Sequence, residues 1–114
     1  SDWKKPLDEL VDYIRANAHD HLTLTDLEKR SHYSARHLQN LFKEKLDCTP
    51  MQFVRRQRLA SAMERLQMAE FGDTVTRISR KYGYVFVSNF TNDFKRQFGV
   101  TPSAVLRASR RRWE

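Results

Sequence analysis

Residues 23–50 are TLTDLEKRSHYSARHLQNLFKEKLDCTP, and residues 74–102 are TVTRISRKYGYVFVSNFTNDFKRQFGVTP. The second stretch repeats the first. Identical pairs lie 51 residues apart up to Tyr33 and 52 apart beyond it, so the second copy has one extra residue in its turn. The identical pairs are Thr23 and Thr74, Thr25 and Thr76, Tyr33 and Tyr84, Asn40 and Asn92, Phe42 and Phe94, Lys43 and Lys95, Thr49 and Thr101, and Pro50 and Pro102. This repeat predicts two similar structural units.

Each copy predicts a short helix, a tight turn, a second helix and a Thr-Pro helix start. In the first copy we expect Thr25 and Glu28 to form a capping box for a helix that ends near Ser31. Ser34 is the expected N-cap of a helix reaching about Leu46. In the second copy we expect helices near residues 76–82 and 87–98, with Gly99 ending the latter.

Three further helices complete the prediction. Residues 6–19 carry apolar side chains on one helical face, and Pro6 suits the first turn. Thr49-Pro50 opens a long linking helix that continues to about Met68, and Thr101-Pro102 opens a closing helix. With only three Gly and three Pro in 114 residues, the composition favours an all-α fold. The C-terminal residues Arg107 and Arg110 to Glu114 are expected to form a solvated tail that can touch phosphate.

The formal net charge is +7 and the sequence pI about 9.9, which favours a polyanionic partner, either nucleic acid or an anionic membrane surface. No segment approaches the ~20 apolar residues of a membrane span, and no cleavable signal precedes the first helix. We therefore expect a soluble intracellular protein. The single Cys48 cannot form an internal disulfide, and we expect a structural thiol.

The second helix of each copy has one apolar face and one face rich in hydrogen-bonding groups. On the first of these helices, Arg36, Asn40 and Lys43 lie opposite the apolar face, with Gln39 at its edge. On the second helix the outward residues are Ser88, Asn89, Asn92 and Arg96. Arg, Gln, Asn and Ser side chains pair with base edges, although any one of them could equally be an ordinary surface residue. The pattern indicates helix-turn-helix units that bind DNA.

The length of the linking helix supports this interpretation. Nineteen residues at about 1.5 Å each give ~28 Å, whereas successive major-groove faces lie ~34 Å apart. Two reading helices could therefore enter neighbouring grooves if the link tilts or the DNA bends, at an elastic cost of order 1 to 6 kcal/mol. We predict bent DNA.

Two stretches are specific enough to indicate a family. They are residues 34–43, SARHLQNLFK, and residues 83–102, in which Gly83-Tyr84, Ser88-Asn89-Phe90 and the closing Phe98-Gly99-Val100-Thr101-Pro102 stand out. The chain resembles the DNA-binding domain of AraC/XylS-type bacterial transcription regulators over about residues 7–109. The resemblance implies a seven-helix domain over residues 1–114, with one helix-turn-helix unit at about 7–48, a linking helix at about 49–69 and a second unit at about 74–109. It also implies binding to an asymmetric promoter site, activation of transcription, contact with RNA polymerase and a cytoplasmic, nucleoid-associated location.

The resemblance also implies roles for individual residues. The base-reading positions, whose side chains contact base edges, are Arg36, Gln39, Asn40, Val87, Ser88, Asn89 and Asn92. The expected phosphate contacts are Thr25, Ser34, Lys43, Thr76, Lys95 and Arg96. Arg55, Arg56 and Arg58 can serve either phosphate or packing within the linking helix.

The sequence departs from the family pattern at several positions. Glu28 replaces a common Ala, His32 a common Gly, and Asn92 a frequent Arg, while Asp47 stands where the second copy has Gly99. The segment Val85-Phe86-Val87 is unusually apolar for a turn facing DNA. Thymine methyl contact, packing and a partner surface remain three interpretations of this segment.

The rival classes of function are an enzyme and an RNA-binding or interaction module. The four His and Cys48 form no metal-ligand spacing, and no nucleophile, base and orienting residue occur together, so we expect neither an enzyme nor a cofactor. An RNA-binding or interaction module is the second rival, separable by competition between duplex DNA and RNA. The start at Ser1-Asp2 suggests a fragment with an effector-binding or dimerisation domain upstream. We expect the fragment itself to be monomeric.

Overall fold

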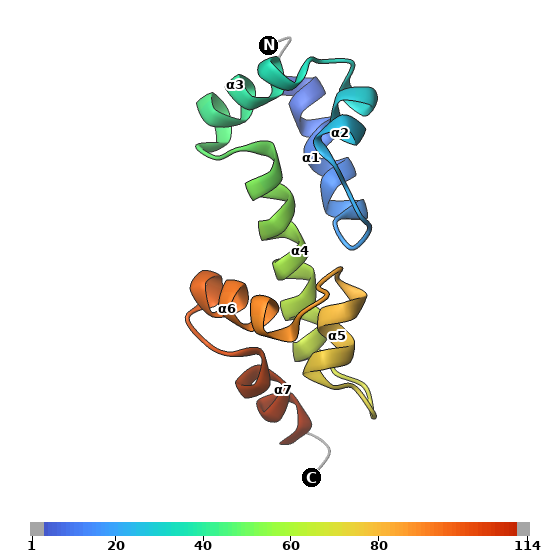
Figure 1. Cartoon of the computed structure of the whole chain (residues 1–114), viewed down its shortest axis with the longest axis vertical. Coiled ribbons are helices and arrows are strands. Elements are labelled where there is room, and N and C mark those ends of the chain that lie inside the picture. The colour runs from blue at the N-terminus through green and yellow to red at the C-terminus, as the bar shows by residue number, and fades with distance from the viewer. Residues whose placement is uncertain (1–3, 112–114) are drawn as a thin grey trace. The chain divides into compact units, whose positions relative to one another are not determined.

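The computed structural model describes residues 4–111. Arg112 to Glu114 of the predicted tail, and Ser1-Asp2, lie outside the described residues. The described part forms seven α-helices and contains no strand, which confirms the all-α prediction. The helices are α1 (Lys4–Asn17), α2 (Leu24–Ser31), α3 (Ala35–Leu46), α4 (Pro50–Gln67), α5 (Val75–Lys81), α6 (Val87–Phe98) and α7 (Pro102–Arg110) (Figure 1).

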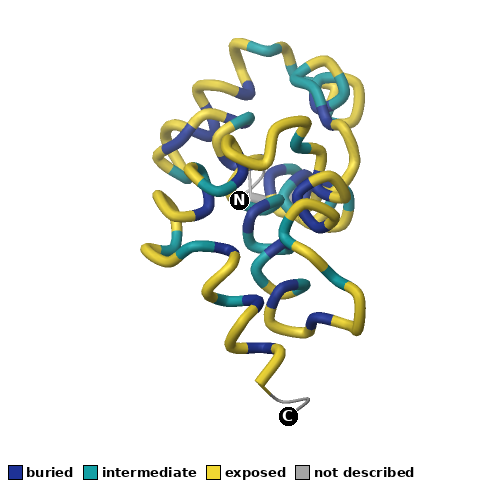
Figure 2. Tube along the Cα trace, turned by 60° about the horizontal axis from the view of Figure 1, so that its bottom comes forward, coloured by how far each residue is buried: buried dark blue, intermediate teal, exposed yellow. Residues whose placement is uncertain are grey.

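The chain divides into two compact units between Gln57 and Arg58, inside α4. In the first unit, α2 packs against both α1 and α3. Buried residues recur along these helices at the spacing of one helical face (Figure 2). The largest fully buried side chains of this unit belong to Ile14, Leu27, Leu38, Phe42 and Val54. The core fixes the face that α3 turns to solvent.

In the second unit, α5, α6 and α7 all pack against one another. Their core is more aromatic. Phe90 and Phe94 are fully buried, with ring centroids 5.6 Å apart, and Phe98 continues the row 4.7 Å from Phe94. Leu59 and Leu66 of α4 are buried in the same cluster. The prediction that Phe90, Phe94 and Phe98 point inward is confirmed, and α6 is oriented by this row.

The N-cap of α2 differs from the prediction. Thr23, not Thr25, is the cap: its Oγ1 accepts from the Asp26 N–H at 3.1 Å, and Asp26 Oδ2 accepts from the Thr23 N–H at 2.9 Å. These hydrogen bonds lower the pKa of Asp26. With Thr23 as cap, Leu22 and Leu27 occupy the two positions of a hydrophobic staple, and both are buried in the first core. Burial of this pair therefore explains why the helix starts two residues early.

Helices α3, α4, α5 and α7 each start after a hydroxyl residue. Ser34 caps α3 as predicted, Thr74 caps α5 and Thr101 caps α7, each accepting a backbone N–H from three residues ahead at 3.1 to 3.2 Å. Thr49 forms a reciprocal capping box with Gln52 at the start of α4. Thr25 and Thr76 therefore lie inside first turns rather than at caps, with exposed side chains.

Two turns of the first unit use non-glycine residues in the left-handed region. His32 has φ 63° and Asp47 has φ 52°, where the second copy has Gly83 at 87° and Gly99 at 76°. The first copy therefore carries backbone strain that the glycines of the second copy avoid. Both copies therefore have a positive φ at the equivalent positions, although the residues differ.

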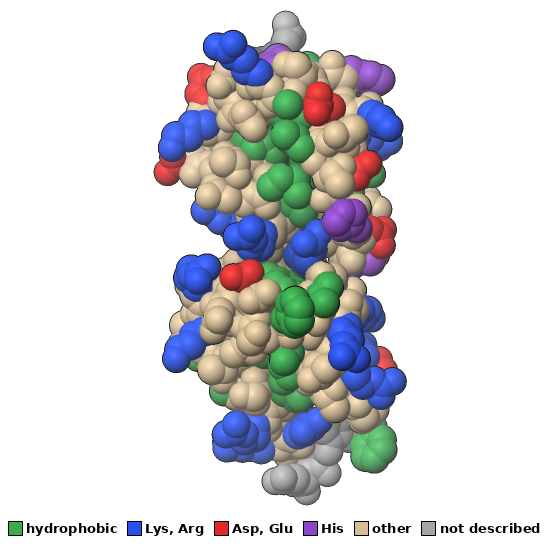
Figure 3. Space-filling view, in the orientation of Figure 1, with side chains coloured by type: hydrophobic (Ala, Val, Ile, Leu, Met, Phe, Trp, Pro, Cys, Tyr) green, Lys and Arg blue, Asp and Glu red, His purple; other side chains and the backbone are tan. Residues whose placement is uncertain are grey.

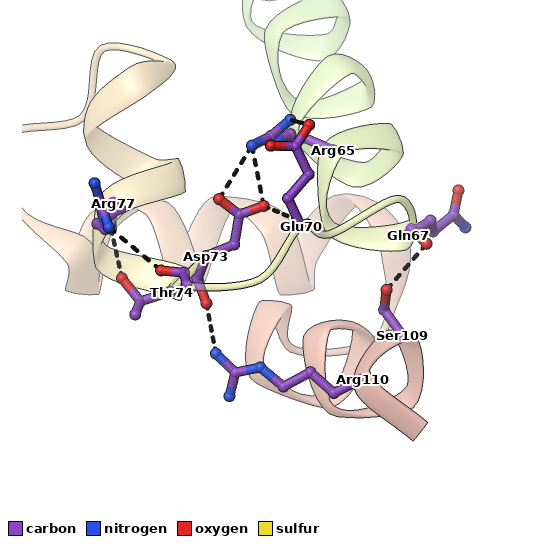
Figure 4. A network of polar contacts seen from close by, with 9 residues as sticks. Arg65, Gln67, Glu70, Asp73, Thr74, Arg77, Ser109 and Arg110 are labelled. Carbon is purple, nitrogen blue, oxygen red and sulfur yellow. Dashed lines mark hydrogen bonds and ion pairs between the residues drawn. The ribbon is translucent and has the colours of Figure 1, made fainter. Parts of the chain in front are cut away.

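A polar clamp holds the turn between α4 and α5 (Figure 4). Arg65 of α4 pairs with Glu70 at 3.2 Å and with Asp73 at 3.1 Å, and Asp73 also accepts the Glu70 N–H at 2.8 Å. From α7, Ser109 donates to the Gln67 carbonyl at 3.1 Å and Arg110 to the Asp73 carbonyl. The expectation of a solvated tail was thus wrong for Arg110, whose side chain is tied to this turn.

Candidate nucleic-acid interface

Helix α3 presents the first group of predicted base-reading residues. Its cap at Ser34 fixes the start of the helix, and burial of Leu38, Leu41 and Phe42 fixes its rotation. The opposite face is therefore turned to solvent. On it, Arg36, Gln39 and Asn40 are all exposed, as is Lys43 one turn later.

Helix α6 presents the second group. Burial of Phe90 and Phe94 leaves the side chains of Ser88, Asn89 and Asn92 exposed, and Val87 is 39% exposed at the first helical position. The structure therefore exposes the second set in the N-terminal half of α6. The predicted rotations of both helices agree with the structure.

These polar side chains are available to a ligand. Within residues 4–111, none of the polar predicted base-reading side chains takes part in a hydrogen bond or ion pair. Each amide has two donors and a two-lone-pair acceptor, and the guanidinium of Arg36 is a planar donor fork. Such groups match adenine and guanine edges in the major groove, where bidentate pairs form. Each helix can therefore offer base edges several hydrogen bonds without breaking internal ones.

The predicted phosphate contacts are also exposed, and some already have partners. Lys43 lies 3.4 Å from Asp47, and Arg96 lies 3.4 Å from Asp93. Exposed ion pairs of this kind contribute about 0 to 1 kcal/mol. Exchanging either pair for a phosphate therefore costs little. The hydroxyl of Ser34 is already engaged as the cap of α3, which leaves its remaining lone pair and its proton for a phosphate oxygen.

Basic residues of α5 were not singled out from the sequence. Arg77, Arg80 and Lys81 have exposed side chains. The sequence contained a signal for Arg80 and Lys81. Both lie in the last turn of α5, the first helix of the unit, and so lie close to the turn between its two helices. Lysine and arginine side chains are spread over the face shown in Figure 3, with fewer acidic ones among them.

The apolar segment Val85-Phe86-Val87 is on the surface. Val85 is 79% exposed and Phe86 65% exposed. Packing in the core, one of the three interpretations of the segment, is therefore wrong. Contact with thymine methyls and contact with a partner surface remain.

The remaining candidate features are metal ligands, a membrane-spanning helix, the thiol of Cys48 and the arginines of α4. Among residues 4–111, no three His, Cys, Asp or Glu side chains are grouped as metal ligands, and no helix is long and apolar enough to cross a bilayer. Cys48 is buried, and its burial raises the pKa of the thiol. On α4, Arg55 and Arg56 are exposed and Arg58 is half-buried.

Comparison with known proteins agrees with this geometry. Residues 27–108 match a family described as a helix-turn-helix domain. The chain is 35% identical over 98 residues to a probable thc operon regulatory protein of Rhodococcus erythropolis, an alignment covering 85% of this chain and 30% of that protein. It is 29% identical over 97 residues to the HTH-type transcriptional activator AarP of Providencia stuartii, covering 85% of this chain and 70% of AarP.

Two solved structures have the same fold. A probable AraC family transcriptional regulator from Rhodopseudomonas palustris CGA009 superposes with a TM-score of 0.85 at 26% identity, covering 93% of this chain and 98% of that one. The DNA-binding domain of AdpA, solved in complex with a target DNA, gives 0.80 at 25% identity, covering 94% and 95%. The family is one of DNA-binding transcription regulators and not of enzymes. With its repeated capped helix pairs and seven-helix fold, the chain belongs to the AraC/XylS family of bacterial transcription regulators.

Proposed function

We propose that this chain binds double-stranded promoter DNA sequence-specifically by inserting α3 and α6 into adjacent major grooves of one asymmetric site. One observation supports this most. Two helices of the same design, each oriented by its own core, turn exposed amide, hydroxyl or guanidinium groups to solvent. The units proposed to act are about residues 7–48 and 74–109, linked by residues 49–69.

The proposed base contacts divide between the two helices. Arg36 is assigned to guanine through a bidentate contact, and Asn40, Gln39, Asn89 or Asn92 to adenine, each good pair contributing about 1 to 3 kcal/mol of discrimination. Ser88 and Val87 complete the second set. Because the two helices carry different side chains at equivalent positions, the two half-sites differ in sequence.

The proposed phosphate contacts fix register without reading sequence. They are Thr25, Ser34, Lys43, Thr76, Lys95 and Arg96. Each cation that neutralises a phosphate releases a counterion, so the affinity should fall steeply with salt concentration. The net charge of +7 is consistent with such a dependence.

The role in transcription is proposed from relatives. AarP is named a transcriptional activator, and the AdpA domain was solved on its target DNA. We propose that this chain is the DNA-binding part of an activator that works on the bacterial nucleoid in the cytoplasm. An upstream effector-binding or dimerisation domain and contact with RNA polymerase belong to the same proposal.

Selection of bound sequences from a random duplex pool tests this function, using the chain itself and the variants Arg36→Ala and Asn89→Ala. Each variant should lose the preference at one or two base pairs in a different half of the site, with an affinity loss of about 5- to 100-fold for the preferred duplex. Arg15→Ala, which removes an exposed cation of α1, is the matched control and should leave the selected sequence unchanged. Selection of no preferred sequence would refute the proposal.

Footprinting and competition test the arrangement on DNA. A monomer should protect two unlike half-sites in tandem, on bent DNA, and duplex of the selected sequence should displace the protein from RNA and from scrambled duplex. A dimer on a palindrome would contradict the tandem arrangement. Stronger competition by RNA would favour the rival RNA-binding function.

A further inference from the structure

The N-terminus of α6 carries an apolar patch formed by Val85, Phe86 and Val87, which are 79%, 65% and 39% exposed. Soluble proteins rarely expose large apolar side chains next to one another, so a contiguous group of them marks a contact surface. The patch immediately precedes Ser88 and Asn89 of the proposed reading face. It therefore lies at the N-terminal end of α6, and in a recognition helix the N-terminal end contacts the bases.

Comparison of the two repeats shows what changed at this place. Phe86 is the N-cap of α6 and corresponds to Ser34, the N-cap of α3, while Val85 is the extra residue of the second turn. The Ser34 hydroxyl accepts the His37 N–H at 3.1 Å, whereas Phe86 makes no side-chain cap hydrogen bond. The second copy thus has an apolar ring where a capping hydroxyl would serve the helix, and most of that ring gains no burial.

The patch is held in place by its neighbours. The Phe86 carbonyl accepts the Asn89 N–H at 3.1 Å. On the other side, the Tyr84 N–H donates to the Ser79 carbonyl at 3.0 Å, and its hydroxyl donates to Asp93 Oδ2 at 2.8 Å. The Tyr84 ring also meets Phe90 edge to face, with centroids 5.2 Å apart. Because both flanks are fixed, the backbone that carries the patch is held in place and loses little freedom on contact.

The surroundings of the patch suit a duplex. Ser88 and Asn89 follow the patch on α6, and the exposed cations Arg80 and Lys81 lie in the last turn of α5, just before the turn that carries the patch. In a major groove, the thymine 5-methyl is the apolar group on the base edges, and it lies between two rows of phosphates. An apolar patch among amides and cations is complementary to that arrangement.

We infer that Val85, Phe86 and Val87 form a thymine-specific contact surface, in which the Phe86 ring and the flanking valines cover the 5-methyl groups of one or two thymines. This inference rests on the proposed function and adds to it a contact that reads sequence by apolar burial rather than by hydrogen bonding. The half-site of the second unit therefore contains thymine at a fixed position. Substitution within the patch removes the preference for thymine, while the base pairs contacted through hydrogen bonds keep their own sequence preference.

The test replaces thymine by deoxyuridine, which removes only the 5-methyl group. Each thymine of the selected duplex is replaced in turn, and binding is measured for the unmodified chain, Phe86→Ser and Val87→Ser. Phe71→Ser is the matched control, because Phe71 is 99% exposed in the turn before α5. Circular dichroism melting shows whether each variant is folded. Val87→Ser leaves the Phe86 ring in place and provides the test if Phe86→Ser does not fold.

For the unmodified chain, deoxyuridine at one or two positions should weaken binding about fourfold each, the value expected for one methyl group's burial. In Phe86→Ser or Val87→Ser that penalty should shrink toward onefold, while Phe71→Ser should retain it. If a preferred duplex is selected but tolerates deoxyuridine everywhere, or if the penalty persists in both patch variants, the inference is wrong while the proposed function stands. If no duplex is preferred, both are wrong.

Discussion

Removal of the Asp73 carboxylate should destabilise the second unit more than any single exposed ion pair would. Asp73 is 15% exposed at its side chain and Arg65 is 24% exposed. Asp73 accepts two hydrogen bonds at once, from the Arg65 guanidinium at 3.1 Å and from the Glu70 N–H at 2.8 Å. Asp73→Ala removes the acceptor of the Glu70 N–H and leaves Arg65 with Glu70 alone.

The magnitude follows from these contacts. A hydrogen bond to a charged group contributes about 1.5 to 3 kcal/mol, and partial exposure of the pair reduces the Arg65 contribution. We expect a loss of about 2 kcal/mol for Asp73→Ala. With a urea slope of about 1 to 1.5 kcal/mol/M, the midpoint should fall by roughly 1.5 M. Glu70→Ala is the matched control, since Glu70 is 72% exposed and its pair should contribute less than about 1 kcal/mol.

The same clamp predicts a pH dependence. Burial opposes ionisation of Asp73, but the Glu70 N–H and the Arg65 guanidinium outweigh it, and the pKa is lowered in the folded protein. The stabilisation is therefore complete well above pH 4, the unfolded carboxyl having a pKa of about 3.9, and it is lost as the pH falls through the folded-state pKa. The difference between the unmodified chain and Asp73→Asn should shrink between about pH 4 and pH 2.

Urea denaturation followed by circular dichroism at pH 7, 4 and 2.5 measures these effects. The account of the clamp would be refuted if Asp73→Ala shifted the urea midpoint no more than Glu70→Ala does. It would also be refuted by a difference between the unmodified chain and Asp73→Asn that persists undiminished at the lowest pH.

Two other predictions use the caps and the thiol. Thr23→Ala should cost about 1 kcal/mol because it removes the α2 cap. Thr25→Ala should leave stability in urea unchanged and weaken DNA binding without changing its salt slope, because a neutral hydroxyl releases no counterion. Equal destabilisation by the two changes would contradict the observed capping box. The Cys48 thiol should react slowly with iodoacetamide at pH 8 in the native protein and rapidly in urea, because burial raises its pKa and blocks access. Equal alkylation rates would show that the thiol is accessible.

Much of the fold was predictable from local sequence. Ser34, Thr49 and Thr101 each combine a capping side chain with a following helical pattern, and Gly99 marks an end, so the bounds of α3, α4 and α6 came within about a residue of those observed. The start of α2 was misplaced because Thr23 and Thr25 are both followed by an acid three residues later. The local rule could not choose between them, and burial of Leu22 with Leu27 did.

The candidate site was predictable to the same extent. Helical periodicity gave the outward rotation of α3 and α6, because one apolar stripe per helix leaves one face for solvent. Helical periodicity did not single out the basic residues of α5, because basic residues also occur at ordinary solvent-exposed helix ends. It could not decide whether Phe86 packs inside or lies on the surface, since an aromatic residue in a turn satisfies either pattern.

The sequence by itself determined the repeat, the helical class, the positive charge and the polar faces, all of which depend on residues a few positions apart. The tertiary structure decided which residues distant in the chain come together. Arg110 reaches the carbonyl of Asp73, and Ser109 the carbonyl of Gln67, across 37 and 42 residues. It also decided that Phe86 has no place in the core. The reason is that hydrogen bonding and periodicity within a helix are local, whereas burial depends on every element that packs around a side chain.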